Sequence, residues 1–205
     1  MAENTYRVAP FSQSAYLDAG TNPSSAGGAC HMFALKWLSE IIHDKSAGSQ
    51  ARMDTLIRYA REVRVLYKAF SARWSREGEV GADEGVAKMV QLTVDDIISY
   101  PSIALLSKAA RDQHRKGYVY TFRFAGGGAH SIAFYRSGAT FGGHLYAMDP
   151  NLGEYKMGKG QLMQWVRWLD LIKYSAFGAI TSHQLRPVSA YVSSGSRIKG
   201  GVKIM

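Results

Sequence analysis

Residues 125–155 read AGGGAHSIAFYRSGATFGGHLYAMDPNLGEY, and this stretch decides the fold class of the chain. Its β-branched and aromatic residues occur in short runs separated by glycine-rich turns, a pattern typical of antiparallel strands joined by hairpins. We predict strands within residues 118–126, 130–138 and 144–149. An amphipathic segment over 159–175 follows, and a last strand is predicted within 179–188.

The part of the chain before residue 117 has helical periodicity instead. Apolar residues recur every three or four positions in 29–43 and in 49–70, where Ser49 is the expected N-cap. A polar loop then precedes a helix that begins near Asp83, and Pro101 divides residues 93–117 into two short helices. Helices followed by an antiparallel sheet predict an α+β fold.

The length of 205 residues favours a single domain. We expect this domain over residues 28–190, with a helical part over 28–116 and a sheet part over 117–190. Residues 1–27, rich in Ser, Ala, Gly and Asn, are expected to form a flexible arm. Residues 191–205 are expected to form a basic flexible tail.

Composition narrows the classes of function. A single cysteine excludes an internal disulfide framework and a multi-thiolate zinc site, and we expect neither a metal nor a cofactor. No apolar run approaches the ~18 residues of a spanning helix, and no general secretory signal is visible. The net charge of +9 favours acidic partners such as an anionic membrane surface. Because no recognition motif accompanies the scattered basic residues, no specific nucleic-acid binding is expected.

The only cysteine, Cys30, follows a glycine-rich segment and is expected to open the first apolar helix. A thiol at a helix N-terminus loses its proton more easily, because free amides and the helix dipole stabilise the thiolate. Cys30 is therefore the candidate nucleophile. The alternative is that it is a small buried apolar residue, which is the usual role of a free cysteine.

Two further residues fit a catalytic role together with Cys30. His130 begins one predicted strand and Asp149 ends the next, so an antiparallel pairing brings their side chains to the same end of the sheet. A histidine can accept the thiol proton while a carboxylate orients its ring. His144 is the competing base, but its odd spacing from Asp149 places the two on opposite faces of a regular strand. His31, next to Cys30, is expected to be structural.

The order Cys, His, Asp, with the cysteine on a helix that contains a tryptophan, resembles the papain-like superfamily. More narrowly, GACHMFALKW (28–37), GAHSIAFYR (128–136) and MDPNLGEY (148–155) resemble the three motif blocks of the YopT-type cysteine proteases, which are bacterial effectors and toxin domains. The resemblance implies a papain-like fold with Cys30 as nucleophile, His130 as general base and acid, and Asp149 as the orienting residue. Pro150, Asn151 and Gly153 would build the turn that holds Asp149.

The resemblance also implies a function and a place of action. It implies a cysteine protease that attacks a peptide carbonyl of a host protein and forms an acyl-enzyme. Such a protein would leave the bacterium through a specialised secretion system and act in the host cell cytoplasm. An oxyanion hole would use the backbone amide of Cys30 and a second donor upstream, for which Asn22 is the first candidate.

Other functions stay open at the level of sequence. A glutamine deamidase, an amidase or an acyltransferase could use the same three residues, because each attacks a planar carbonyl next to nitrogen or a related acyl group. Outside enzymes, a basic protein that binds nucleic acid or a membrane surface fits the charge alone.

Overall fold

One antiparallel sheet forms the centre of the protein, in a computed structural model that describes residues 5–17, 23–106, 117–138, 143–158 and 160–192. Within these residues the strand order is β1-β7-β6-β5-β4-β8-β2, and β3 pairs with β8 as well. The strands are β1 (Arg7–Pro10), β2 (Leu92–Val94), β3 (Ile98–Tyr100), β4 (Gly117–Phe124), β5 (Ala129–Arg136), β6 (Leu145–Asp149), β7 (Gly153–Met157) and β8 (Ile180–Ala190).

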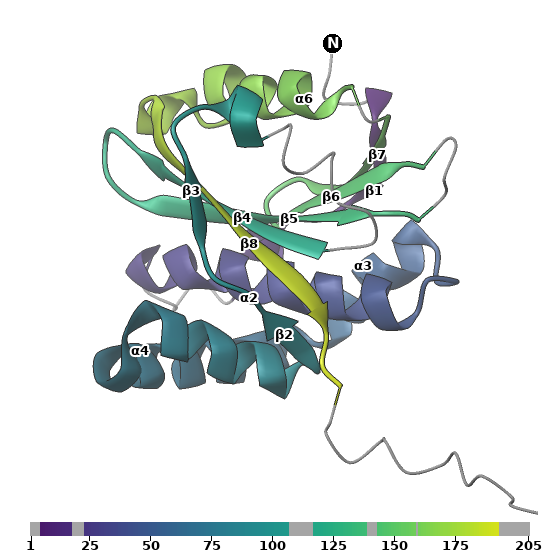
Figure 1. The fold of residues 1–205 in the computed structure, drawn as a ribbon. Coiled ribbons are helices and arrows are strands. Elements are labelled where there is room, and N and C mark those ends of the chain that lie inside the picture. Colours follow the sequence, from purple (N-terminus) through teal and green to yellow (C-terminus); the bar gives the residue numbers. More distant parts are fainter. Residues whose placement is uncertain (1–4, 18–22, 107–116, 139–142, 159, 193–205) are drawn as a thin grey trace, which may run out of the picture.

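Helices cover both faces of this sheet (Figure 1). On one face lie α2 (Pro23–His43), α3 (Ser49–Arg58) and α4 (Ala60–Met89), and on the other lies α6 (Leu162–Trp168). Each face therefore has its own apolar core. Along β5, for example, Ala133 and Tyr135 face the core under α2, while Ile132 and Phe134 face the core under α6. This explains why the strands are apolar at successive positions: both of their faces are buried.

The predicted α+β architecture is confirmed, with the long helices α2, α3 and α4 ahead of an antiparallel meander from β4 to β7. No helix among the described residues combines the length and the apolar character that crossing a bilayer would require.

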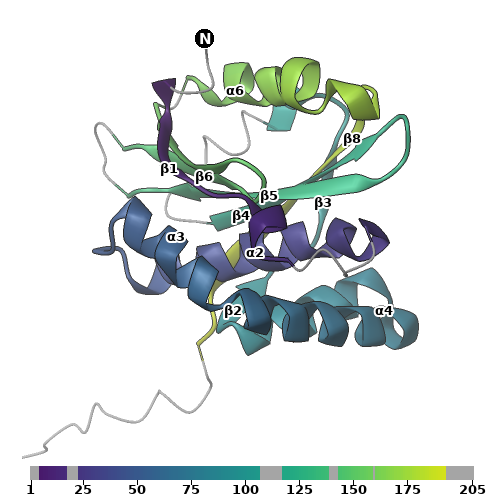
Figure 2. The same cartoon turned by 180° about the vertical axis from the view of Figure 1, so that it is seen from behind.

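The expected arm over residues 1–27 differs from the structure where the structure describes it. Residues Arg7–Pro10 pair with β7 as an edge strand (Figure 2), and Phe11 is buried in the core under α2. Helix α2 begins at Pro23 rather than near Cys30. Proline is favoured at the first helical position, where its missing N–H costs nothing, and this explains the earlier start.

Three other expectations for the helical part are corrected. The predicted helix over 49–70 divides at Tyr59 into α3 and α4, and Gly48 rather than Ser49 occupies the N-cap of α3. The polar segment before Asp83 belongs to α4, which is kinked at Gly78, where φ is +72°. The first of the two short helices expected over 93–117 is replaced by β2 and β3, both of which pair with the long strand β8.

A buried carboxylate close to the candidate site links two helices to the sheet through hydrogen bonds and an ion pair. Glu154, on β7, is fully buried. Its Oε2 accepts hydrogen bonds from Trp37 Nε1 at 2.7 Å and from Arg52 Nε at 3.0 Å. Its Oε1 accepts from Ser49 Oγ at 2.6 Å and from Arg52 Nη2 at 2.5 Å. These contacts hold α2 and α3 in a fixed position relative to the hairpin that carries Asp149.

Candidate active site

The hairpin between β6 and β7 positions the carboxylate of Asp149. Asp149 pairs with Gly153, the N–H of Asn151 donates to Asp149 Oδ1 at 2.8 Å, and the side chain is fully buried. Gly153 is required here, because its φ is +116° and a Cβ would lie 2.2 Å from the carbonyl oxygen of Ala9. Two of the turn residues named from the sequence, Asn151 and Gly153, are therefore part of the hairpin that positions Asp149.

His130 lies where β5 extends past the end of β6. The pairing of these strands begins at Ala133 and Met148, so the first residues of β5 run beyond it. His130 Nε2 lies 3.0 Å from Asp149 Oδ1, and the ring is buried. The buried carboxylate thus accepts from Nε2–H, which leaves Nδ1 for a second partner.

Cys30 is a further partner of the imidazole. The thiol is hydrogen-bonded to His130, and the backbone N–H of Ser131 donates to the sulfur. Cys30 is the eighth residue of α2 and only 1% exposed, so it does not open the helix as expected. Because the helix dipole acts mainly within the first turn, it is not the source of acidity here. The imidazole and the Ser131 amide supply that effect instead.

The electrostatics of the pair favour charge separation. Burial raises the pKa of the Cys30 thiol, but the charge and hydrogen bond of His130, the Ser131 amide and the charge of His31 together lower it below its ordinary value. Burial also lowers the pKa of His130, while Asp149 and Cys30 raise it, with a net result of about 10. Between these two pKa values the pair exists as thiolate and imidazolium, the form of a sulfur nucleophile ready to react.

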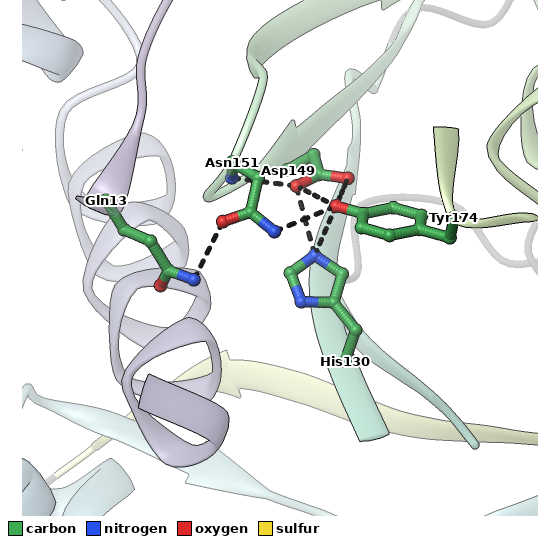
Figure 3. Close-up of polar contacts among 5 residues, drawn as sticks. All are labelled: Gln13, His130, Asp149, Asn151 and Tyr174. Atoms are coloured by element: carbon green, nitrogen blue, oxygen red, sulfur yellow. Dashed lines mark hydrogen bonds and ion pairs between the residues drawn. The ribbon is translucent and has the colours of Figure 1, made fainter. Parts of the chain in front are cut away.

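Tyr174 is a further residue of the site, and its role was not predicted from the sequence. Its hydroxyl donates to Asp149 Oδ2 at 2.8 Å, lies 3.0 Å from His130 Nε2, and accepts from Asn151 Nδ2 at 3.1 Å. Figure 3 shows these groups gathered around one nitrogen of the imidazole while the other nitrogen faces away from them. Burial and the nearby carboxylate raise the pKa of Tyr174, so the hydroxyl keeps its proton and acts as a donor.

Gln13 is the second residue that the sequence did not indicate. Its buried side chain donates from Nε2 to Asn151 Oδ1 at 2.8 Å, and its Oε1 has no partner among the described residues (Figure 3). Its own N–H donates to the Pro150 carbonyl at 2.6 Å, which ties the segment after β1 to the turn that holds Asp149. Asn22, the expected oxyanion donor, lies outside the described residues.

The remaining histidines of interest occupy other positions. His144 is exposed and precedes β6, whereas Asp149 ends that strand, so the structure does not bring the two together. His31 forms an ion pair with Asp83 at 2.9 Å. Within the described ranges, no group of three or more His, Cys, Asp or Glu side chains is arranged to hold a metal ion.

Comparison with known proteins places the fold. No family model and no curated protein matches the sequence. The crystal structure of the Pseudomonas avirulence protein AvrPphB superposes with a TM-score of 0.63 at 20% identity, over 87% of this chain and 100% of that one. The expected papain-like α+β fold is confirmed by this match, which shows a shared fold.

A second solved structure is PatoxP, a cysteine protease-like domain of the Photorhabdus asymbiotica toxin PaTox. Its TM-score is 0.47 at 12% identity, over 93% of this chain. The match covers 55% of the PatoxP chain, so this protein spans about half of its length.

Proposed function

We propose that this chain is a cysteine peptidase of the YopT type, with Cys30 as nucleophile, His130 as general base and acid, and Asp149 as the orienting residue. The observation that carries the proposal is the arrangement around His130. One ring nitrogen is held by a fully buried carboxylate 3.0 Å away, and the thiol is hydrogen-bonded to the same imidazole. That is the geometry of a base that is fixed in one tautomer beside its nucleophile.

The reaction proceeds in two halves. The Cys30 thiolate attacks the peptide carbonyl carbon, a C–S bond forms, and the carbonyl oxygen becomes an oxyanion. His130 then gives its proton to the leaving nitrogen as the C–N bond breaks, which leaves an acyl-enzyme. In the second half His130 removes a proton from water and the hydroxide attacks the thioester carbonyl carbon. The C–S bond then breaks, which releases the carboxylic acid product and restores the Cys30 thiolate beside the His130 imidazolium. Asp149 and Tyr174 keep the imidazole oriented throughout.

The oxyanion requires donors, and Gln13 is a candidate in addition to Asn22. In a helix that begins at Pro23, the N–H of Cys30 points to the carbonyl four residues earlier and is not free for substrate. The Gln13 amide has two N–H groups, of which Asn151 accepts one. A preorganised donor of this kind stabilises the transition state of acyl transfer.

The proposed setting is a host cell. The resemblance to bacterial effectors, together with a fold shared with a protein named for avirulence, supports export through a specialised bacterial secretion system and action on a host protein. The net charge of +9 supports contact with an anionic membrane surface on the way to that substrate.

The decisive experiment compares host-type cells that express the native protein with cells that express Cys30→Ala. New protein N-termini that appear only with the native protein would establish proteolysis. A change of glutamine to glutamate without chain cleavage would assign a deamidase that uses the same three residues, and a transferred acyl group would assign an acyltransferase. Identical proteomes in the two cell populations would contradict the proposal.

A further inference from the structure

Large apolar side chains are exposed on the segment that follows α6. A π-helical turn, η2 (Leu169–Lys173), and a 3₁₀ turn, η3 (Ser175–Phe177), form this segment. Leu171 is 72% exposed, Ile172 is 63% exposed and Phe177 is 54% exposed. Because helical turns rise only about 1.5–2.0 Å per residue, these three side chains emerge within about 12 Å of one another along the chain. They form one surface, called the 171–177 surface below.

The turn between β4 and β5 supports this surface. The Gly126 N–H donates to the Phe177 carbonyl at 3.1 Å, and the Ala125 N–H donates to the Ala179 carbonyl at 2.9 Å. The rings of Phe124 and Phe177 stack with their centroids 5.3 Å apart. A Cβ at position 126 would lie 2.7 Å from the Phe177 carbonyl oxygen, so glycine permits this close backbone approach. The exposed side chains are therefore held on a hydrogen-bonded support.

Basic residues accompany the apolar ones. The hairpin turn with its preceding residues 123–124 and the segment over 162–181 together contain three basic residues and one acid, namely Arg123, Arg167, Lys173 and Asp170. Arg123 and Arg167 are exposed. The Nζ of Lys173 lies 5.4 Å from the ring centre of Trp168, and the Asp170 carboxylate accepts from the Ile180 N–H at 3.0 Å. The elements that carry the 171–177 surface therefore have a net positive charge.

These properties favour a lipid bilayer as the partner of this surface. Leu171 and Ile172 are consecutive and both mostly exposed, so they project from the protein instead of lining a groove. Leucine is under-represented among the residues that dominate protein–protein interfaces, whereas Leu and Phe next to Lys and Arg are typical of segments that lie in a membrane interface. Two copies with a net charge of +9 each repel one another, which disfavours self-association. The basic residues select anionic headgroups.

We propose that the 171–177 surface inserts into the interface of an anionic lipid bilayer. Leu171, Ile172 and Phe177 enter the boundary between headgroups and acyl chains, and Arg167 and Lys173 lie at the level of the lipid phosphates. The inference rests on the membrane contact that the proposed function includes, and it assigns that contact to a defined part of the chain.

Docking through this surface also brings the catalytic residues close to the membrane. Tyr174 lies between Ile172 and Phe177 in the sequence, and its side chain is buried on the inner side of the same segment. Its hydroxyl lies 3.0 Å from His130 Nε2 and 2.8 Å from Asp149 Oδ2. The segment that contacts the lipid is therefore the one that contacts the catalytic histidine.

The test measures how the chain partitions onto sedimented vesicles of phosphatidylcholine that contain phosphatidylserine, with vesicles of phosphatidylcholine alone as the reference. The native protein should bind the anionic vesicles more tightly. Leu171→Ser/Ile172→Ser should lower the partition coefficient at least about tenfold, because two inserted side chains are lost. Arg167→Gln should weaken binding to the anionic vesicles only.

A matched control removes two exposed aliphatic side chains elsewhere. Val65 and Val80 are 59% and 48% exposed on α4, which covers the opposite face of the sheet from α6 (Figure 1). Val65→Ser/Val80→Ser should therefore leave the partition coefficient unchanged. All of the substituted side chains are exposed, so the melting temperatures of the variants should match that of the native protein.

The outcomes separate this inference from the peptidase proposal. A native protein that binds neither kind of vesicle overturns the inference and leaves the surface to a protein partner. Equal binding to both kinds of vesicle overturns the assignment of anionic lipid. Binding that survives Leu171→Ser/Ile172→Ser and is lost at high salt shows attachment by net charge alone, and this also overturns the inference. Cys30→Ala should bind vesicles as the native protein does, so neither result depends on catalysis.

Discussion

The pairing of Cys30 with His130 makes a direct prediction about the pH dependence of thiol alkylation. A simple thiol with a pKa of ~8.5 is only about 0.3% thiolate at pH 6, and its alkylation rate rises roughly tenfold for each pH unit up to that pKa. The pKa of Cys30 is lowered by His130 and by the Ser131 amide, so its thiolate persists at lower pH. The rate for Cys30 should therefore level off where that of a simple thiol is still rising.

The magnitude follows from two opposing factors. Full ionisation would increase the thiolate population at pH 6 by up to about 300-fold over a simple thiol. Nucleophilicity falls as the pKa falls, with a Brønsted coefficient of about 0.4–0.5, so the net rate advantage has an upper bound on the order of tenfold. Because Cys30 is buried, limited access of the reagent lowers the alkylation rate by the same factor at every pH. The pH at which the rate levels off is therefore a better measure of the Cys30 pKa than the absolute rate.

The alkaline side distinguishes alkylation from turnover. The pKa of His130 is raised to about 10, so the imidazolium is present below that pH and is lost as pH rises through it. Turnover should then fall above pH 10 because the leaving nitrogen receives no proton. Alkylation should not fall, since the thiolate remains.

The assay is intact-mass spectrometry with iodoacetamide, which is unambiguous because the chain has one cysteine. In His130→Ala the thiol loses the charge and the hydrogen bond that oppose burial, so its pKa rises and the rate at pH 6 should drop about tenfold or more. His144→Ala, at an exposed position, is the matched control and should behave as the native protein. A native profile parallel to that of a free cysteine peptide would refute the reasoning.

Three further substitutions test the groups around the imidazole by kcat and by melting temperature. Asp149→Ala should cut turnover about 100-fold or more, and it should also lower the melting temperature because the buried Asn151 N–H and Tyr174 hydroxyl lose their acceptor. Full activity in that variant would leave a Cys–His dyad. Tyr174→Phe should lower kcat about tenfold with little change in KM, since a hydrogen bond to a charged group contributes about 1.5–3 kcal/mol and only part of it acts on the ring. An unchanged kcat would make Tyr174 a packing residue. Gln13→Leu should lower kcat by a factor on the order of 10²–10³ if its amide binds the oxyanion. A lower melting temperature with an unchanged kcat would exclude Gln13 as the oxyanion donor and leave Asn22 as the candidate.

The sheet and the positions of His130 and Asp149 could be predicted because their signals are local. Glycine turns and runs of β-branched and aromatic residues define β4 to β6, and the Asp-Pro-Asn-x-Gly sequence defines the turn. The start of α2 was not predictable in this way. Gly27 and Gly28 each disfavour a helix by about 1 kcal/mol, and the packing of the rest of α2 in the core outweighs them.

Tyr174 and Gln13 could not be found from the sequence, because their roles depend on contacts between distant residues. Tyr174 lies 44 positions from His130, and Gln13 lies 138 positions from Asn151. Tyr174 is one of twelve tyrosines, and nothing in its neighbours marks it. The strands β2 and β3 were missed for a related reason: short apolar runs fit a helix or a strand equally well, and only the long partner β8 decides between them.

The edge strand β1 has a practical consequence for anyone who shortens this chain. A fragment that starts at Gly28 would retain Cys30, His130 and Asp149 and would look complete by its motifs. It would nevertheless expose the edge of β7, remove the hydrogen bond from Gln13 to the Asp149 turn, and leave Gly153 without the backbone that closes over it. Loss of activity in such a fragment would therefore not test the catalytic roles of Cys30, His130 and Asp149. An expression fragment intended for activity assays should start ahead of Arg7.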